Sequence, residues 1–529
     1  MSSAPISTET NYWENFVVTD EDLEFINNHL FELESPQTTV ELVSALVNSR
    51  ITKEKNSITK KKQELGRLYL PKDSYQLNDS VLFSTANWQS AKVVSIRDGV
   101  NPEYSPFKVI DVEFQNGDKR SFASEFQDHS LNSPQDMMAG LKHLDPEFVI
   151  EHYGVSLTGK LQDVLVHDND LVLTAGAWFP RALLVDINIG HLNLAEAVLD
   201  MAGGEPITTP ALMSQLDLPD DVNRDLLEFS LNFALQEDPR FDEVGPSGEV
   251  LWFLERLEPE NVRTVPMHLQ YSGDPVDRSM FDVQMIRTEI QLDDEYSPKD
   301  SSTSYKLDEV QLVLTYPHWR AGSLPLSNRT DALFPIALES PRIKFQFIDS
   351  ESNTPFPGWV VRPYKYVVGL RDWYLVNNII PGSIITIHKK NSAGDVVINA
   401  NKKRPNKEWI RTALVGADEE VVLALLKQQI STSYEERMAT AIPDVDAMDR
   451  VWNLTGKQKP GIEQTILRIA RELTKLNPQG HIHALELYAA ANVLRRIPLE
   501  VVFYYLANHK AFSHVGDLYY RLIDGPEQE

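Results

Sequence analysis

Apolar positions near the start of the chain follow helical spacing and then give way to short alternating runs. Leu23, Ile26 and Leu30 recur at helical spacing after Thr19, a residue type that accepts hydrogen bonds at helix starts. This pattern predicts a first helix. The pattern that follows predicts a second helix at 38–50 and a third, polar and basic helix at 51–68. Two short strands around a turn are predicted at 69–83.

Three helices followed by a β-wing is the order of a winged helix, and the same order recurs twice further along the chain. We predict winged-helix units at 17–84 and at 191–257, and a third at the end of a helical region, 413–524. The two later units end in a hairpin that begins with the phrase F-x-x-V-G. In the earlier hairpin four side chains are expected to enter the core: Phe241, Val244, Leu251 and Phe253.

Between these units the periodicity is that of β-strands. Residues 85–126 alternate apolar and polar positions, and Asn116-Gly117 is a strong hairpin signal. We expect a small Tudor- or KOW-like barrel there, or an extension of the preceding wing. Residues 127–190 are predicted as a linker and a β-hairpin. Strand-like runs dominate 262–412, and their number suggests a barrel.

These elements define an α+β, multi-domain chain in which repeated winged-helix units are combined with small β-barrel domains. Its 529 residues are enough for about three to five domains. Among the strand-like runs of the barrel region is FDVQMIRTEIQL, residues 281–292. The next stretch, 293–304, is acidic and Ser-rich, and we predict a mobile loop.

The formal net charge is -27, but it is distributed unevenly along the chain. Residues 50–67 and 389–411 each carry seven Lys or Arg against two acidic residues, so each island is +5. An acidic body repels phosphates and opposes non-specific nucleic-acid binding. The islands therefore indicate either local contacts with a polyanion or two solvated basic surfaces without a partner.

Composition excludes several classes of protein. The chain has no cysteine, which removes disulfides, thiolate metal sites and thiol catalysis, and favours a reducing, cytoplasmic location. No run approaches the ~18 apolar residues of a membrane-spanning helix. The first residues lack the basic and apolar regions of a secretory signal.

Residues 191–257 resemble the winged-helix domain of the RNA polymerase delta subunit and its relatives, the HARE-type helix-turn-helix. The resemblance implies a role in transcription, chromatin or restriction through contact with DNA or polymerase. The predicted third helix, 220–238, departs from this expectation because it is acidic where a DNA-reading helix offers Arg, Lys or Asn. Protein contact or packing is therefore expected for this unit. The residues that carry the resemblance are Asp238, Arg240, Phe241, Val244, Gly248 and Trp252.

Residues 310–390 look like the plant B-three-type DNA-binding pseudobarrel, in which loops at one end of the barrel contact the major groove. Ser383 follows the last of the matching residues where that family usually has Asp. The resemblance implies DNA binding by this region. The matching residues, in a short helix and at the following turn, are Gly369, Leu370, Trp373, Tyr374, Pro381 and Gly382.

Two short motifs have the spacing of a functional site without its context. Residues 154–160 fit G-x-x-x-x-G-K, but Leu161 stands where a P-loop needs Ser or Thr, and we expect a loop between strands. His481 and His483 alternate as metal ligands can, but no carboxylate completes a known spacing, so ordinary histidines are expected.

No nucleophile elbow and no nuclease motif is found, so no catalytic, metal-binding or cofactor-binding residue is assigned. Adjacent aromatic pairs such as Trp373-Tyr374 could stack on bases, although such pairs more often anchor cores.

The leading hypothesis is a non-enzymatic, nucleic-acid-associated or transcription-associated protein that contacts DNA, RNA polymerase or another protein. One alternative is an acidic interaction scaffold or DNA mimic, and another is a restriction or defence enzyme whose site is assembled from distant residues. No membrane partner is expected. Basic residues that would contact phosphates, from the two islands and from the barrel region, are Arg50, Lys53, Lys55, Lys60, Lys61, Lys62, Arg320, Arg329, Arg362, Lys365, Arg371, Lys402, Lys403 and Arg404.

Overall fold

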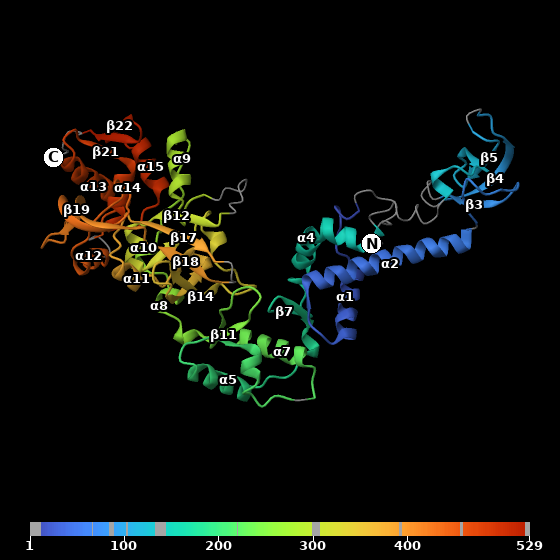
Figure 1. The fold of residues 1–529 in the computed structure, drawn as a ribbon, viewed down its shortest axis with the longest axis horizontal. Coiled ribbons are helices and arrows are strands. Elements are labelled where there is room, and N and C mark those ends of the chain that lie inside the picture. Colours follow the sequence, from blue (N-terminus) through green and yellow to red (C-terminus); the bar gives the residue numbers. More distant parts are fainter. Residues whose placement is uncertain are drawn as a thin grey trace. The chain divides into compact units, whose positions relative to one another are not determined.

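The chain has an α+β fold with several separate sheets (Figure 1). Its contacts divide it into two units, residues 1–187 with 219–233, and residues 188–218 with 234–529. The division passes through the helix α7 (Arg224–Glu237). The computed structural model describes residues 12–65, 67–83, 89–101, 104–132, 144–219, 221–298, 307–390, 394–454 and 459–523.

The first unit starts with a helix, a short strand and a long helix. The remaining elements of its core follow in the sequence after an inserted sheet. Asp22 accepts hydrogen bonds from the backbone N–H and the hydroxyl of Thr19, which fixes the start of the first helix. The elements of this core are α1 (Asp20–Leu33), β1 (Gln37–Thr38), α2 (Thr39–Leu65), α4 (Pro146–Leu165), β7 (Leu171–Thr174) and β8 (Ala177–Pro180). They form a three-stranded antiparallel sheet in which β8 lies between β1 and β7.

A five-stranded sheet is inserted between α2 and α4. Its core is aromatic, with Tyr69, Phe83 and Phe114 buried, and its strands follow one another in space as they do in sequence. Gly117 has a φ of +87° in the turn between the last two strands, as the Asn116-Gly117 signal predicts. The strands are β2 (Arg67–Leu68), β3 (Ser80–Phe83), β4 (Gln89–Asp98), β5 (Lys108–Phe114) and β6 (Lys119–Ser124).

The separate third helix predicted at 51–68 is wrong, because one helix, α2, runs from Thr39 to Leu65 (Figure 1). Its first half is amphipathic and buries Leu42 and Leu46, whereas its second half is polar in sequence and exposes Lys53, Lys55 and Lys60. The change in pattern marks the point at which α2 leaves the core, and no Gly or Pro interrupts it.

Residues 127–190 contain a helix that the sequence analysis missed. α4 buries Val149, Leu157 and Leu161 against α1 and α2. The predicted loop at 154–160 lies within this helix, so the expectation there is wrong. The β-hairpin predicted at 161–174 is wrong in its bounds, because residues 161–165 are the last turn of α4, and the hairpin of this region is formed by β7 and β8 instead.

The second unit opens with the elements predicted from 191–257. They are α5 (Ile189–Met201), β9 (Ile207–Thr208), α6 (Thr209–Met213), then α7 across the division, and the hairpin β10 (Phe241–Glu243) and β11 (Leu251–Leu254). The sheet is again antiparallel, with β11 between β9 and β10. Phe241, Val244 and Phe253 are buried as expected, and Leu251 is partly buried.

The C-terminal elements repeat the order once more. They are α13 (Ile462–Leu476), β21 (His481–His483), α14 (Ala484–Leu494), α15 (Leu499–Asn508), β22 (Phe512–Gly516) and β23 (Tyr519–Leu522), with β23 between β21 and β22. All three segments therefore share one order of elements and one order of strands.

Equivalent positions of the three segments hold similar side chains. The fourth residue of each second helix is a fully buried leucine, namely Leu42, Leu212 and Leu487. The last strand of each sheet holds a buried aromatic residue at the same register, opposite the first strand: Trp178, Trp252 and Tyr520. The indoles of Trp178 and Trp252 donate to the first residue of the second helix, Thr39 at 3.0 Å and Thr209 at 3.1 Å.

A seven-stranded curled sheet forms the centre of the second unit. Its one parallel pair joins β14 and β18, and all its other pairs are antiparallel. The core within the curl contains Phe347, Val360, Ile385 and Ile398. In spatial order the strands are β12 (Glu309–Val313), β17 (Ile384–Lys389), β18 (Val396–Asn399), β14 (Arg342–Asp349), β15 (Pro355–Val361), β16 (Tyr366–Val368) and β13 (Ser323–Pro325). Short helices beside it are α8 (Glu260–Arg263), α10 (Tyr316–Ala321) and α11 (Arg371–Val376).

Two predictions before this sheet are wrong. The run expected as a strand at 281–292 contains the helix α9 (Val283–Leu292), which Asp282 caps by accepting from the backbone N–H of Met285. The start of the predicted mobile loop is buried, because Asp293, Asp294 and Glu295 are at most 7% exposed. Of the rest of that predicted loop, residues 299–304 lie outside the described residues.

A long two-stranded ribbon connects the curled sheet with the C-terminal helices. Its strands are β19 (Lys402–Val415) and β20 (Val421–Thr432), so strands extend into the region predicted to be helical. At one end Ser433 donates its N–H to the carbonyl of Asn401, and at the other Val421 and Leu423 enter the C-terminal core. The helix α12 (Val445–Trp452) follows.

Candidate nucleic-acid interface and ligand groove

The basic residues predicted on the first winged helix lie on α2. Arg50 is 9% exposed, and its guanidinium pairs with Asp22 and donates to the carbonyl of Val17, so its role is structural. Lys53, Lys55 and Lys60 are exposed on the second half of α2. Lys61 and Lys62 belong to the same helix, but their side chains lie outside the described residues.

Most basic residues predicted on the curled sheet are held by carboxylates or carbonyls of the same unit. Arg320 pairs with Asp449, Arg329 with Asp293, and Arg362 with Asp331. Lys365 donates to the carbonyl of Glu295 at 3.2 Å. Arg371, in contrast, is exposed, with no ion pair recorded within the part of the chain that the structure describes.

The third helices of the three repeated segments are not basic surfaces. α4 carries three acidic residues and one lysine, and α15 carries Glu500 and no Lys or Arg. Phe229 of α7 packs on Phe179 of β8 with ring centroids 5.9 Å apart. Phe503 of α15 packs on Phe281 just before α9. These helices therefore present few cations, and α7 and α15 contribute aromatic side chains to packing within their units.

The ribbon is mostly exposed at residues 404–409 and 425–429, which we call its exposed middle, whereas residues 410–413 are buried. The two strands hold six Lys or Arg and one Glu. Lys402 pairs with Thr432 and Asn406 with Ile430, so the three residues between Lys402 and Asn406 oppose a single residue in a bulge. Pro405 lies in this bulge, where the ladder needs no donor.

Cations on the ribbon are of three kinds. Lys403 pairs with Glu408 at 3.2 Å, and Arg411 is buried, where desolvation lowers its pKa to about 10. Arg404, Lys407 and Lys427 are exposed, with no ion pair recorded among the described residues. The ammonium of Lys427 lies 5.3 Å from the ring centre of Trp409, which is 65% exposed.

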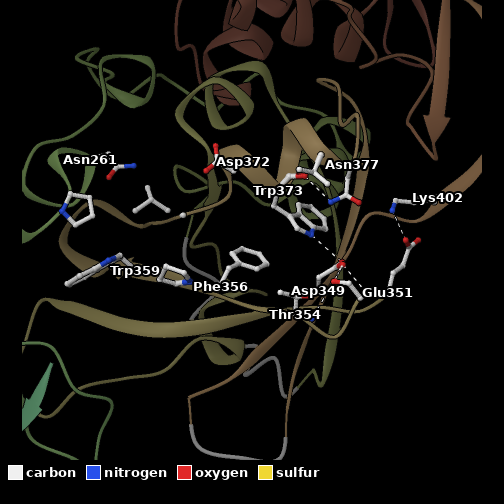
Figure 2. A pocket seen from close by; sticks show the side chains of 16 residues that line it. Asn261, Asp349, Glu351, Thr354, Phe356, Trp359, Asp372, Trp373, Asn377 and Lys402 are labelled. Atoms are coloured by element: carbon white, nitrogen blue, oxygen red, sulfur yellow. Dashed lines mark hydrogen bonds and ion pairs between the residues drawn. The ribbon is translucent and has the colours of Figure 1, made fainter. Parts of the chain in front are cut away.

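A groove of about 770 Å³ lies beside the curled sheet (Figure 2). We call it the aromatic groove, because Trp359, Phe356 and Trp373 lie in succession along it. Residues of α8, the β14–β15 hairpin and α11 line it. A second chamber of about 820 Å³ shares Asn261 and Asp372 with it.

Carboxylates outnumber ammonium groups three to one in the lining of the aromatic groove. Asp349 accepts from the indole of Trp373 at 3.2 Å and from the hydroxyl of Ser352 at 2.6 Å. Although desolvation opposes ionisation, these hydrogen bonds hold the pKa of Asp349 below its usual value. Asp372 is exposed at the rim. The groove's lysine, Lys402, is joined to Glu351 at 2.5 Å.

The second chamber is a poorer candidate for a functional site than the aromatic groove. Its histidine, His268, is buried, and desolvation together with nearby Arg320 lowers its pKa to about 4, so the imidazole is neutral at pH 7. Arg320 is already paired with Asp449, whereas Arg371 faces solvent. Among the described residues that line the chamber, Arg371 is therefore an exposed cation with no recorded ion pair.

A row of three side chains has the connectivity of a Ser–His–acid relay. His318 bonds Ser323 Oγ through Nδ1 at 2.8 Å and Glu295 through Nε2 at 3.0 Å. Their exposures are 1%, 0% and 6%, and neither His318 nor Ser323 lines the groove or its second chamber. Within the described residues the Ser323 hydroxyl is buried, and the row contributes hydrogen bonds to the interior of the second unit.

The same row joins a buried charge network at the C-terminal helices. The guanidinium of Arg496 is fully buried and pairs with Asp294 at 2.9 Å and with Glu295 at 2.8 Å. Arg496 and His318 hold the pKa of Glu295 well below its usual range, although desolvation acts against ionisation. The acidic stretch predicted as a loop thus ties the sheet to α14 and the segment after it, since Tyr488 also donates to Asp294.

Sequence reasoning missed the two features that define the candidate sites. Lys427 and Trp409 become neighbours only through strand pairing, which the apolar pattern of 421–426 did not suggest. The aromatic groove combines residues more than one hundred positions apart. Of the two histidines considered for metal binding, His483 caps α14, accepting from the N–H of Leu485.

Comparison with protein-family models, curated proteins and solved structures found no match for this chain. Within the described residues, no helix combines the length and apolarity needed to cross a membrane. In the same part of the chain, no group of three or more His, Asp or Glu is arranged to hold a metal ion.

Proposed function

We propose that the chain is a non-enzymatic, nucleic-acid-associated protein that contacts phosphates through the β19–β20 ribbon. The observation that carries this proposal is the ribbon's exposed middle, where Arg404, Lys407 and Lys427 project from a chain of net charge -27. A two-stranded ribbon fits the major groove of duplex DNA. An exposed tryptophan, Trp409, adds a surface on which an unpaired base can stack.

In this proposal the three repeated segments are winged-helix units and the curled sheet is a pseudobarrel. The shared order of elements, the central position of the last strand and the buried aromatic residue opposite the first strand support this assignment. The first unit differs in carrying the five-stranded sheet between its second and third helices. Because the third helices pack within the protein, base reading is not assigned to them.

The test is a salt titration of binding to duplex and single-stranded DNA by fluorescence anisotropy, using the full chain. The triple variant Arg404/Lys407/Lys427→Ala removes up to three phosphate contacts. We expect the log–log salt slope to fall by about one to three units. We expect Trp409→Ala to weaken single-strand binding about 5- to 100-fold, with a smaller effect on duplex.

A matched control changes the same amount of charge elsewhere. Lys108, Lys119 and Arg120 of the inserted sheet each pair with a nearby carboxylate, so Lys108/Lys119/Arg120→Ala should leave the slope unchanged. A Lys53/Lys55/Lys60→Ala variant measures the share contributed by α2. If the ribbon variant keeps the wild-type slope, or if the wild type binds neither DNA at low salt, the proposal is wrong.

A second candidate function is protein assembly, which the packing role of the third helices favours. An acidic winged-helix scaffold would bind a basic protein through faces other than the ribbon. It predicts an association that weakens with salt and is unaffected by the ribbon substitutions. Sedimentation of the full chain with a polycationic test protein, with and without those substitutions, distinguishes the two functions.

A further inference from the structure

We propose that the aromatic groove binds an alkylammonium group, with its methylene chain against the rings and its charge facing the carboxylates. The proposal does not depend on nucleic-acid contact by the ribbon. It assigns a ligand class to a site whose lining does not include Arg404, Lys407 or Lys427 of the ribbon.

The size and shape of the groove limit the ligands that it can bind. The groove's volume of about 770 Å³ lies within the range of ligand pockets and exceeds what a lone ion or water needs. Trp359, Phe356 and Trp373 follow one another along it in that order, as Figure 2 shows. This arrangement suits an extended aliphatic chain better than a compact ring.

Charge then decides the class of ligand. Three carboxylates line the groove, those of Asp349, Glu351 and Asp372, against the single ammonium of Lys402. The potential therefore favours a cation and repels phosphate groups. Electron-rich aromatic surfaces add attraction for a cation, and Phe356 is the most exposed of the three rings.

The chain already supplies one example of the interaction. Lys402 extends to the groove and places its ammonium 2.5 Å from a carboxylate oxygen of Glu351. One carboxylate of the site is thus occupied by an internal ammonium, whereas Asp372 has no recorded partner among the described residues. An external ammonium is expected at Asp372.

The lining is held in place without a ligand. The hydrogen bond from the Trp373 indole to Asp349 fixes that ring, and Asn377, 4% exposed, donates to the carbonyl of Trp373 at 2.9 Å. Gly369 (φ +116°) lines the floor, where a Cβ would lie 2.5 Å from the carbonyl oxygen of Pro357. Rigid lining reduces the ordering cost of binding.

The experiment is isothermal titration calorimetry of the full chain with spermidine, acetyl-lysine amide (free ε-ammonium) and its ε-trimethylated form. The neutral comparison is acetyl-norleucine amide, and the anionic one is adenosine monophosphate. We expect the lysine amides to bind at least tenfold more tightly than norleucine amide. Tighter binding of spermidine would identify a free polyamine as the ligand, and tighter binding of the lysine amides a peptide side chain.

Four variants test the geometry. Asp372→Asn and Phe356→Leu should each weaken cation binding about fivefold. Glu309→Gln, an exposed carboxylate on β12 outside the groove, should change it less than twofold. Lys402→Met should strengthen binding, because it frees Glu351 for the ligand.

Three results would overturn the proposal. They are equal binding of lysine and norleucine amides, equal effects of Asp372→Asn and Glu309→Gln, and no cation binding at 10 mM, roughly the weakest affinity a pocket of this kind supports. Thermal unfolding of each variant shows whether it is folded. Because Asp372 and Glu309 are both exposed, a loss confined to Asp372→Asn cannot come from general unfolding.

Discussion

Single residues show that the phrase F-x-x-V-G has different roles in its two copies. Phe241 and Phe512 are both buried and occupy the same register in their hairpins. Val244 is fully buried, whereas Val515 is 49% exposed. The phenylalanine therefore belongs to the repeated core, and the valine of the first copy is buried by the curled sheet, which its own segment does not supply.

The two glycines of the phrase also differ. A Cβ on Gly245 would lie 1.9 Å from the carbonyl oxygen of Glu249, so the hairpin backbone excludes any side chain there. Gly516 faces open space but has a φ of +126°, which L side chains rarely adopt. The same glycine of the phrase thus meets a steric requirement in the first copy and a backbone-dihedral requirement in the second.

The buried threonines at the starts of α2 and α6 give a residue-level prediction. Thr209→Val should lower the free energy of unfolding by about 1–3 kcal/mol, because the buried indole of Trp252 loses an acceptor. Thr39→Val should act in the same way through Trp178. The measurement is calorimetric unfolding of the full chain.

Thr264→Val is the control for both substitutions, because Thr264 is exposed and bonds a carbonyl of its own turn. The third segment already has alanine at the equivalent position, Ala484. Equal effects of the buried and exposed substitutions would show that the indole bonds contribute nothing.

At the scale of elements, the β10–β11 hairpin carries acidic groups into a buried junction with the curled sheet. Arg342 of β14 pairs with Glu258 at 2.5 Å and with Asp242 at 3.3 Å. Burial raises the pKa of Glu258 to about 8 and that of Glu243 to about 7. The hairpin is therefore most firmly held when Glu243 retains its proton.

This gives a pH dependence with a definite sign. The pKa of Glu243 is higher in the folded protein than in the unfolded chain, so its contribution to stability is complete below about pH 4.5 and lost as pH rises through about 7. We expect the free energy of unfolding to fall by about 1–2 kcal/mol for this group between pH 5 and 8.

Glu243→Gln should flatten part of that profile, measured by urea unfolding at four pH values. Exposed Glu249 of the same hairpin provides the matched variant, Glu249→Gln, which should leave the slope as it is in the wild type. A slope that is unchanged in Glu243→Gln would contradict the assignment.

Elements with local signals were predicted, and elements defined by distant pairing were not. The hairpin of residues 241–254 and the Asn116-Gly117 turn follow from apolar alternation and turn chemistry. The sequence pattern predicts two helices where the structure has the single helix α2, because the second half of α2 lacks the apolar stripe of the first half. Nothing local marks Asp294 and Glu295 as buried, since their partner Arg496 lies about two hundred residues away.

In the candidate sites, too, features with a local signal were predicted and features that depend on distant contacts were not. Basic islands were visible in composition, and the ribbon's Arg404 belongs to one of them. Whether a cation is free depends on the carboxylate opposite it, as the pairing of Arg320 with Asp449 shows. The aromatic groove could not be predicted, because its rings and carboxylates meet only when α8 and α11 pack on the β14–β15 hairpin.

For the whole molecule, the inserted sheet behaves as a separable part. It has its own aromatic core, and the last buried residue of α2 in the first unit's core is Ile51. Replacing residues 57–143 by a flexible linker of about 20 residues, with a root-mean-square span of about 25 Å, should leave the first unit folded.

Calorimetry of this full-length deletion variant should show one transition fewer and the remaining transitions within a few degrees of the wild type. As a control, the same linker placed at 155–164 interrupts α4 and should abolish the transition of the first unit. Loss of that transition in both variants would show that the inserted sheet is required for folding of the first unit.

The insertion also affects the order in which parts of the chain can fold during synthesis. α1 and α2 bury their apolar faces against α4, but residues 66–145 must be synthesised before α4 begins. At about 5–20 residues per second, the ribosome needs roughly 4–16 s to make them. Throughout that interval Leu30, Leu42 and Leu46 lack their final partners, while the inserted sheet can already form. A nascent chain of this protein thus completes its second folded part before its first, and the waiting helices are where a chaperone would bind.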